Sequence, residues 1–221
     1  MPVLVAGGCA IFAFPASAST INFSGYTWTV KSGVGLGPGP NTWSNSSRSV
    51  YTDGKGRLHL KVRKIAGVWN SSEVFLPSSL GYGRYDFYID SRVDREDPSL
   101  VAAPFIYAND SNEFDIEWSK WKNTFATTTD DFAVQPSNVS YFRDVLTNAT
   151  SLDTIDWSAT SVTFIVSQNG VVKHEQVYTG ASNFAPGSEA VHINHWMFQG
   201  TPPQDKRRDH DLIIKSFVFT P

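Results

Sequence analysis

Sulfur-containing residues are scarce in this chain, whose 221 residues include one cysteine, Cys9, and two methionines. Cys9 lies in an N-terminal segment that we expect to be removed, so the mature protein is predicted to have neither a disulfide bond nor a thiol nucleophile. The residues around Cys9 fit a lipidation site poorly. A mature chain of this length buries enough core to fold without disulfide bonds.

The chain also lacks a basic stripe and a long apolar segment. Its formal net charge is -3, which argues against a nucleic-acid partner. Residues 3–14 are almost wholly apolar but too few to span a membrane. Followed by Ala16-Ser17-Ala18, they predict a signal peptide over residues 1–18 and a secreted protein, extracellular or periplasmic.

Metal-binding spacing is absent as well. Of the five histidines, His192 and His195 are three residues apart, which on a strand places them on opposite faces. No Ser-His-Asp order and no phosphate-binding loop stands out. We therefore expect no catalytic metal and no required cofactor.

What the chain contains is a succession of short β-rich runs separated by turn residues. The clearest runs cover residues 57–63, 82–90, 100–107, 113–118, 161–167, 171–177, 190–198 and 211–219. Asp53 to Gly56 and Gln168 to Gly170 indicate hairpin turns, and Gly33 to Pro40 is expected to be an irregular loop. No stretch keeps a helical apolar period over three turns. The chain is predicted to be an all-β sandwich forming one domain, residues 19–221.

The most informative stretch is residues 112–118, Asn-Glu-Phe-Asp-Ile-Glu-Trp. Glu113, Asp115 and Glu117 alternate with apolar residues at a period of two, which predicts a β-strand with all three acids on one face. The apolar residues, Trp118 among them, are then expected to point into the core. A solvated edge strand has a similar pattern, so the rest of the chain has to decide between the two.

Two carboxyl groups in different protonation states are what a glycoside hydrolase requires. Crowding three acids on one strand face raises the pKa of at least one of them. In a straight strand the Cα atoms of Glu113 and Glu117 lie about 13 Å apart. Sheet curvature and long side chains bring the carboxyl groups toward the separation of about 5–5.5 Å found in retaining enzymes.

Several other segments accompany the acid strand in a recognisable order. They are Asn41-Thr42-Trp43, Ser72-Glu73-Val74, Gly81 to Asp86, Val134-Gln135-Pro136 and Ile193-Asn194-His195-Trp196. In content and order, essentially the whole mature chain resembles glycoside hydrolase family 16, which includes lichenases, laminarinases, agarases, carrageenases and xyloglucan-modifying enzymes. The resemblance implies a concanavalin A-like jelly roll of two antiparallel sheets, whose concave face forms a glycan cleft.

The resemblance also implies residue roles. Glu113 matches the family's nucleophile, Asp115 its helper and Glu117 its general acid/base, in a reaction that retains the anomeric configuration. The single residue between Asp115 and Glu117 matches the lichenase and xyloglucan branches and favours a regular strand without a bulge.

Other positions are candidates for sugar contact. The substrate-binding candidates are Asn41, Glu73, Tyr107, Gln135 and Trp196. We expect Trp196 to stack on a sugar ring, with a core tryptophan as the alternative. Glu73 has an alternative role as the ion-pair partner of Arg84. Lichenases carry an arginine two residues after the counterpart of Glu73, and this chain has Phe75 there, which predicts a more apolar cleft.

The favoured function is a secreted endo-acting glycoside hydrolase of a β-glucan or galactan, acting as a monomer by double displacement. A non-catalytic, lectin-like jelly roll is an alternative, although a lectin has no need of a nucleophile pair. A transglycosylase is another, because both reactions use the same glycosyl-enzyme. Many family members hold a structural Ca²⁺ on the convex side. Asp211 is a conceivable ligand here, or an ordinary aspartate at the start of a strand.

Overall fold

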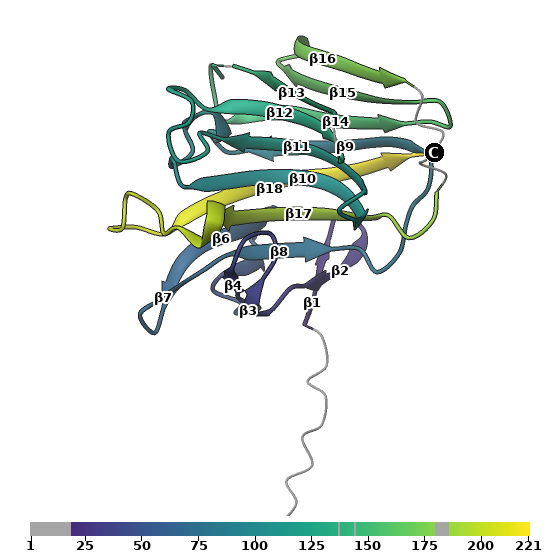
Figure 1. The fold of residues 1–221 in the computed structure, drawn as a ribbon. Helices are drawn as coiled ribbons and strands as arrows, with labels where there is room; N and C mark the ends of the chain where they lie inside the picture. Colours follow the sequence, from purple (N-terminus) through teal and green to yellow (C-terminus); the bar gives the residue numbers. More distant parts are fainter. Residues whose placement is uncertain (1–18, 137, 144, 180–185) are drawn as a thin grey trace, which may run out of the picture.

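Two large antiparallel sheets lie face to face in the computed structural model of the chain (Figure 1). The structure describes residues 19–136, 138–143, 145–179 and 186–221. The predicted signal peptide, with Cys9, lies outside the described residues. The predicted all-β jelly-roll sandwich is confirmed. No helix in the described part of the chain is long and apolar enough to cross a membrane.

The first sheet has eight strands and carries the acid strand at β11. In spatial order its strands are β1 (Thr20–Phe23), β2 (Tyr26–Val30), β8 (Ser72–Phe75), β17 (Ala190–Met197), β10 (Leu100–Asn109), β11 (Asn112–Ser119), β12 (Thr129–Val134) and β13 (Asn138–Phe142).

The second sheet packs behind the first and also has eight strands. In spatial order they are β16 (Val171–Thr179), β15 (Ser161–Gln168), β14 (Thr150–Trp157), β9 (Gly83–Asp90), β18 (His210–Thr220), β6 (Leu58–Ile65) and β5 (Val50–Thr52), with β7 (Val68–Asn70) paired to β6. The remaining elements are the hairpin of β3 (Gly33–Leu36) and β4 (Asn41–Trp43) and the 3₁₀ turns η1 (Val93–Arg95) and η2 (Phe198–Gly200).

The eight strands predicted from sequence are all present as β6, β9, β10, β11, β15, β16, β17 and β18, with ends that differ by at most two residues. Both predicted hairpin turns are confirmed. The first joins β5 to β6, and the second joins β15 to β16 with Asn169 and Gly170 at φ 54° and 75°. Positive φ at both residues suits the twist of a two-residue hairpin.

The expectation of an irregular loop from Gly33 to Pro40 is only partly right. Gly33–Leu36 forms β3, which pairs with β4. Alternating glycines hid this strand, because glycine is depleted in strands generally. The tip that follows, Gly37 to Gly39, lines the cleft described below.

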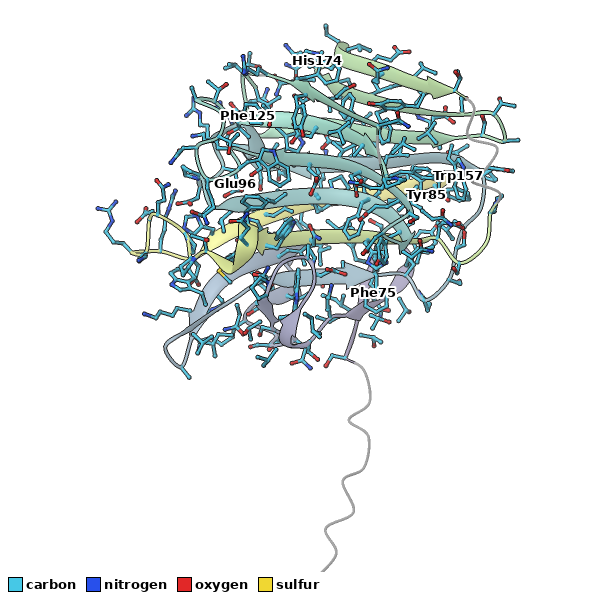
Figure 2. All side chains as sticks on the ribbon, in the orientation of Figure 1. Phe75, Tyr85, Glu96, Phe125, Trp157 and His174 are labelled. Atoms are coloured by element: carbon cyan, nitrogen blue, oxygen red, sulfur yellow. The ribbon has the colours of Figure 1, made fainter. Side chains whose placement is uncertain are left out.

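The core fills the space between the two sheets. Phe114, Ile116 and Trp118 of β11 are buried there, as the alternation of the acid strand predicts. The indole of Trp118 donates to the Asp153 carboxylate at 2.9 Å, and the ring of Phe114 packs against Trp157. Figure 2 shows Trp157 near Tyr85, toward the end of the sandwich that carries the C-terminus. The apolar side chains of β11 therefore anchor this strand to the core between the sheets.

Ile116→Ala tests this anchoring. Ile116 is fully buried, so we expect the substitution to lower the free energy of unfolding by about 2–5 kcal/mol through lost burial and the cavity left behind. Val171→Ala on the edge strand β16 is the matched control, because Val171 is 61% exposed, and its effect should stay within about 0.5 kcal/mol. Urea unfolding of the wild type and the two variants measures both changes in the free energy of unfolding. Equal effects would contradict the packing described for β11.

Candidate active site

The outer face of the first sheet carries an open cleft of about 710 Å³. Its floor comes from side chains of β8, β17, β10 and β11, and part of its wall from the loop tip at Gly37 to Gly39. The lining residues are Lys31, Leu36, Gly37, Pro38, Gly39, Glu73, Ala103, Phe105, Tyr107, Asp110, Glu113, Asp115, Glu117, Trp121, Gln135, His192, Asn194 and Trp196.

The three acids of β11 lie along the cleft floor, and each has a different cross-strand partner. The register pairs are Glu113 with Tyr107 and Asp115 with Phe105, both on β10, and Glu117 with Asp131 on β12. Cross-strand partners share a sheet face. The solvated edge strand is therefore excluded, because β11 is an interior strand and its acids line a cleft.

Burial shifts the titration of all three acids in the same direction. It raises the pKa of Glu113 to about 7 and that of Glu117 to about 8, and it holds the pKa of Asp115 well above its usual range. For Glu117, the negative charges of Asp131 and Glu113 add to the effect of burial. Removing a carboxylate from water and placing it near like charges both favour the neutral form.

Asp115 interacts with both outer acids, with Glu113 through a hydrogen bond and with Glu117 through its charge. It hydrogen-bonds Glu113, and this contact lowers the pKa of Glu113 while raising that of Asp115. Gln135 also hydrogen-bonds Asp115. All three acids therefore resist ionisation, and Glu113 and Asp115 act on each other's titration directly. Such an environment favours a neutral carboxyl group near neutral pH, which a general acid requires.

Of the predicted sugar-contact residues, Glu73, Tyr107, Gln135 and Trp196 line the cleft, whereas Asn41 does not. Asn41 is fully buried. Its amide nitrogen donates to the Pro38 and Met197 carbonyls at 2.7 and 3.0 Å, and its amide oxygen accepts from Ser71 at 2.8 Å. The prediction of direct sugar binding is therefore wrong for Asn41, which fastens the loop tip to β17.

Glu73 has different partners from the one that the sequence suggested. Arg84 pairs with Asp86 on the second sheet. The Glu73 carboxylate contacts Lys31 Nζ at 2.8 Å and His192 Nδ1 at 3.0 Å. Lys31 also lies over the ring of Trp43, 4.2 Å from its centroid. The expectation of a more apolar cleft near Phe75 is thus corrected, because Lys31, directly after β2, brings a cation to this end of the cleft.

Trp196 is packed more tightly than a stacking platform would be. Only 6% of its surface is exposed, and its ring belongs to an apolar cluster with Trp43 and Val101. This leaves little ring surface for stacking on a sugar, so the predicted stacking is not supported. Trp196 Nε1 and the neighbouring Asn194 Oδ1 are buried without a hydrogen-bond partner among the described residues. Both residues line the cleft, but these two atoms are themselves buried.

Sequence reasoning missed several residues of the cleft. His192, Asn194 and Trp196 alternate along β17, so all three share the face that lines the cleft. The spacing in the sequence therefore predicts the other two once one of them is assigned to the cleft. Asp131 lies beside Glu117 without lining the cleft, and it follows from recognising β12 as the strand paired with β11. Lys31 and Trp121 reach the cleft only through the tertiary fold, so no spacing in the sequence identifies them.

The two histidines of β17 face opposite sides, as predicted. His192 lines the cleft, whereas His195 is fully buried between the sheets. His195 Nδ1 lies 3.1 Å from the Leu60 carbonyl, and its Nε2 lies 3.3 Å from the Glu96 carboxylate. Glu96 is at the end of the sandwich opposite the C-terminus (Figure 2).

No group of three His, Cys, Asp or Glu side chains in the described residues is arranged to hold a metal ion. Asp211 lies on β18, with His59 Nδ1 at 3.0 Å and Lys61 Nζ at 3.7 Å from its carboxylate. A structural Ca²⁺ at Asp211 stays an untested prediction.

Comparison with solved structures places this fold among known proteins. A Bacillus licheniformis β-glucanase has a TM-score of 0.67 at 15% identity, covering 94% of this chain and 100% of that chain. A glycoside hydrolase family 16 endo-glucanase from Bacteroides ovatus has a TM-score of 0.64 at 14% identity, covering 87% and 94%. A pseudo β-1,3-glucanase of Mycobacterium tuberculosis has a TM-score of 0.65 at 16% identity, covering 87% and 89%.

No family model matches the sequence, and no curated protein matches it either. The chain has the jelly-roll fold of glycoside hydrolase family 16 proteins, so the resemblance read from the sequence is confirmed at the level of the fold.

The raised pKa of Glu117 predicts that this residue destabilises the protein at alkaline pH. Its pKa rises from an ordinary value of 4.5 to about 8 in the folded protein, so the folded state binds this proton more tightly than the unfolded state. Stability is therefore lost as the pH rises through this window. We expect Glu117→Gln to unfold at higher denaturant concentration than wild type at pH 8, by on the order of 2 kcal/mol, with a much smaller difference at pH 4.

Glu175→Gln is the control for this measurement, because Glu175 is exposed on β16. Its stability relative to wild type should be the same at pH 4 and pH 8. If Glu117→Gln behaves in the same way as this control, Glu117 is not held in a buried, like-charged environment.

Proposed function

We propose that this protein is a secreted, retaining, endo-acting glycoside hydrolase of uncharged polysaccharides. The observation that carries the proposal is the pair Glu113 and Glu117 on the floor of one cleft, with pKa values of about 7 and about 8 and with Asp115 hydrogen-bonded to Glu113. A retaining glycosidase needs this division between an ionised and a protonated carboxyl group.

Each acid has a defined step in the proposed reaction. Glu113, kept anionic by its hydrogen bond from Asp115, attacks the anomeric carbon as the glycosidic bond breaks. Glu117 gives its proton to the departing oxygen. Glu117 then removes a proton from water, which attacks the glycosyl-enzyme and frees Glu113. Tyr107, Gln135 and Glu73, which line the cleft, bind sugar hydroxyls in this proposal.

The charges of the cleft support an uncharged substrate. The lining includes the carboxyl groups of Glu73, Asp110, Glu113, Asp115 and Glu117, and Lys31 is the one lysine or arginine among the lining residues described. Lys31 is already paired with Glu73. A sulfated or carboxylated chain would meet like charge with no free cation to offset it. Neutral β-glucans and neutral galactans therefore suit this cleft better than carrageenan or porphyran.

A non-catalytic, glycan-binding role is the second candidate, because one protein of similar fold is described as a pseudo β-1,3-glucanase. The arrangement of Glu113, Asp115 and Glu117 favours catalysis, since binding alone needs no pair of glutamates with raised pKa values. Transfer to a second sugar instead of water uses the same glycosyl-enzyme. We further propose that the protein acts outside the cell as a monomer.

Glu113→Gln and Glu117→Gln should each lower kcat by about 10³-fold or more while leaving the fold intact, because removing either member of such a unit abolishes most of the catalysis. Release of reducing sugar measures kcat, and circular dichroism checks the fold. Glu175→Gln is the control, since Glu175 is exposed on β16 and does not line the cleft, and it should retain most activity. Near-normal turnover of either glutamine variant would sink the assignment.

The anomeric configuration of the products distinguishes the proposed role of Glu113 from that of Glu117. Early product from a β-linked glycan should be the β-anomer by proton NMR. Azide should partly restore Glu117→Ala on an activated substrate and give a β-glycosyl azide, because Glu113 still forms the intermediate. From Glu113→Ala any azide product should be the α-anomer. An α-anomer as first product of the wild type would show inversion.

A substrate panel tests the charge argument. We expect reducing sugar to be released from at least one of lichenan, laminarin, xyloglucan and agarose, and none from carrageenan or porphyran. The physical reason is like-charge repulsion between sulfate groups and the cleft carboxylates. Binding to a neutral glycan without any cleavage favours the lectin-like alternative. Cleavage confined to a sulfated glycan would contradict the charge argument.

A further inference from the structure

A fourth carboxyl group lies next to the acid strand and has no role in the steps above. Asp131 of β12 is the register partner of Glu117 and is only 1% exposed. Side chains of such cross-strand partners have Cβ atoms about 4.5–5.5 Å apart on the same face of the sheet. A buried aspartate at this position places a second acid against the one that donates the proton.

The indole of Trp121 holds Asp131 in place. Trp121 Nε1 donates to Asp131 Oδ2 at 2.5 Å, while the Trp121 ring lines the cleft and packs edge-on against Phe198. Asp131 Oδ1 is buried with no hydrogen-bond partner among the described residues. The Thr129 hydroxyl donates to the Ser119 carbonyl at 3.1 Å, and the Thr129 side chain, like that of Trp121, also acts to lower the pKa of Asp131. One oxygen is fixed and the other is left without a donor.

The backbone that presents Trp121 is strained. Trp121, Lys122 and Asn123 have φ values of 48°, 57° and 66°, three consecutive residues in the left-handed region. That region is unusual for a bulky residue such as tryptophan and costs about 1–3 kcal/mol per residue. Hydrogen bonds hold the turn, from Lys122 N to the Pro98 carbonyl at 2.7 Å and from Thr124 Oγ1 to the Trp121 carbonyl at 2.7 Å. Such strain is usually found at functional sites.

We propose that Asp131, held by Trp121, is a positioning residue that keeps the proton on Glu117 and so extends the general-acid activity of the cleft to higher pH. The inference rests on the proposed role of Glu117 as the general acid. With Oδ2 bound by the indole and Oδ1 lacking a donor, the two neighbouring carboxyl groups share a proton more easily than both ionise. Two close acids that interact in this way titrate as a pair.

The charges around Glu117 agree with this role. On β11 the neighbouring acids are Glu113 and Asp115, and on β12 the neighbour is Asp131. The groups whose charges raise the pKa of Glu117, after burial, are Asp131 first and Glu113 second. Burial raises the pKa of Asp131 itself to about 7, so the pair carries at least one proton through neutral pH.

Among the described residues, no lysine or arginine forms an ion pair with Asp131 or Glu117. Asp131 pairs on its far side with Tyr141 of β13, whose pKa is raised by burial and then by the charges of Asp131 and Glu117. β10 contributes the uncharged Ala103 to the cleft. In the strained turn, Lys122 Nζ donates to Gln199 at 3.1 Å.

Asp131→Asn tests the proposal through the pH dependence of kcat/KM on a neutral glycan. The basic limb reports loss of the Glu117 proton, and we expect it to move down by about one pH unit when the neighbouring charge is removed. Asp110→Asn is the matched control. It also replaces an aspartate by asparagine, but Asp110 acts on Glu113 and not on Glu117, so the basic limb should stay in place.

Trp121→Phe tests the same proposal without altering Asp131 itself. It keeps an aromatic ring against Phe198 and removes the N–H donated to Asp131, which makes Asp131 easier to protonate. The basic limb should move in the same direction as in Asp131→Asn, by less. In the Asp131→Asn background, Trp121→Phe should add no further shift, because their effects share one interaction. Independent, additive shifts would overturn the link through Trp121.

A direct titration keeps this proposal separate from the proposed function. The ¹³C carboxyl resonance of Glu117, assigned by its loss in Glu117→Gln, reports the protonation of Glu117 whether or not any glycan is cleaved. We expect its midpoint to fall by about one pH unit in Asp131→Asn and to stay in place in Asp110→Asn. An unchanged midpoint in Asp131→Asn overturns the proposal. If wild type cleaves no glycan while the midpoint falls, the proposed function fails and the Asp131–Glu117 coupling stands.

Discussion

The site depends on the position of β11 inside the first sheet. Strands β10 and β12 flank it, and the alternation of its side chains sends Ile116 and Trp118 into the core while Glu113 and Glu117 face the cleft. A shift of one residue in register would reverse these faces. It would bury the acids between the sheets and expose the apolar residues. Burial of the apolar side of β11 therefore fixes where the carboxyl groups stand.

The same placement raises the pKa values of the acids at the expense of stability. A carboxylate removed from water and set beside like charges resists ionisation. The raised pKa values of Glu113, Asp115, Glu117 and Asp131 all have burial as their largest cause. Sites of this kind commonly lower the stability of the fold that holds them. The two-sheet core, with its buried tryptophan and phenylalanine side chains, offsets this cost.

The two ends of the cleft are built differently. At one end Glu73 binds Lys31 and His192, so its charge is satisfied within the protein. At the other, Trp121 binds Asp131, and no lysine or arginine among the described residues is paired with that carboxylate. The difference suits a cleft in which one region binds sugar hydroxyls and another holds a proton ready for the leaving oxygen.

The sequence alone determined the strand of alternating acids, eight of the strands and two hairpin turns, because side-chain alternation and turn residues act over a few neighbouring positions. Tertiary structure decided the rest. Asn41 looked like a sugar contact and is a buried fastener of the loop tip. Lys31 reaches Glu73 from 42 residues earlier in the chain, and Asp131, held by Trp121, comes beside Glu117 only when β12 pairs with β11. Burial, which raises the pKa values, exists only once the two sheets have packed.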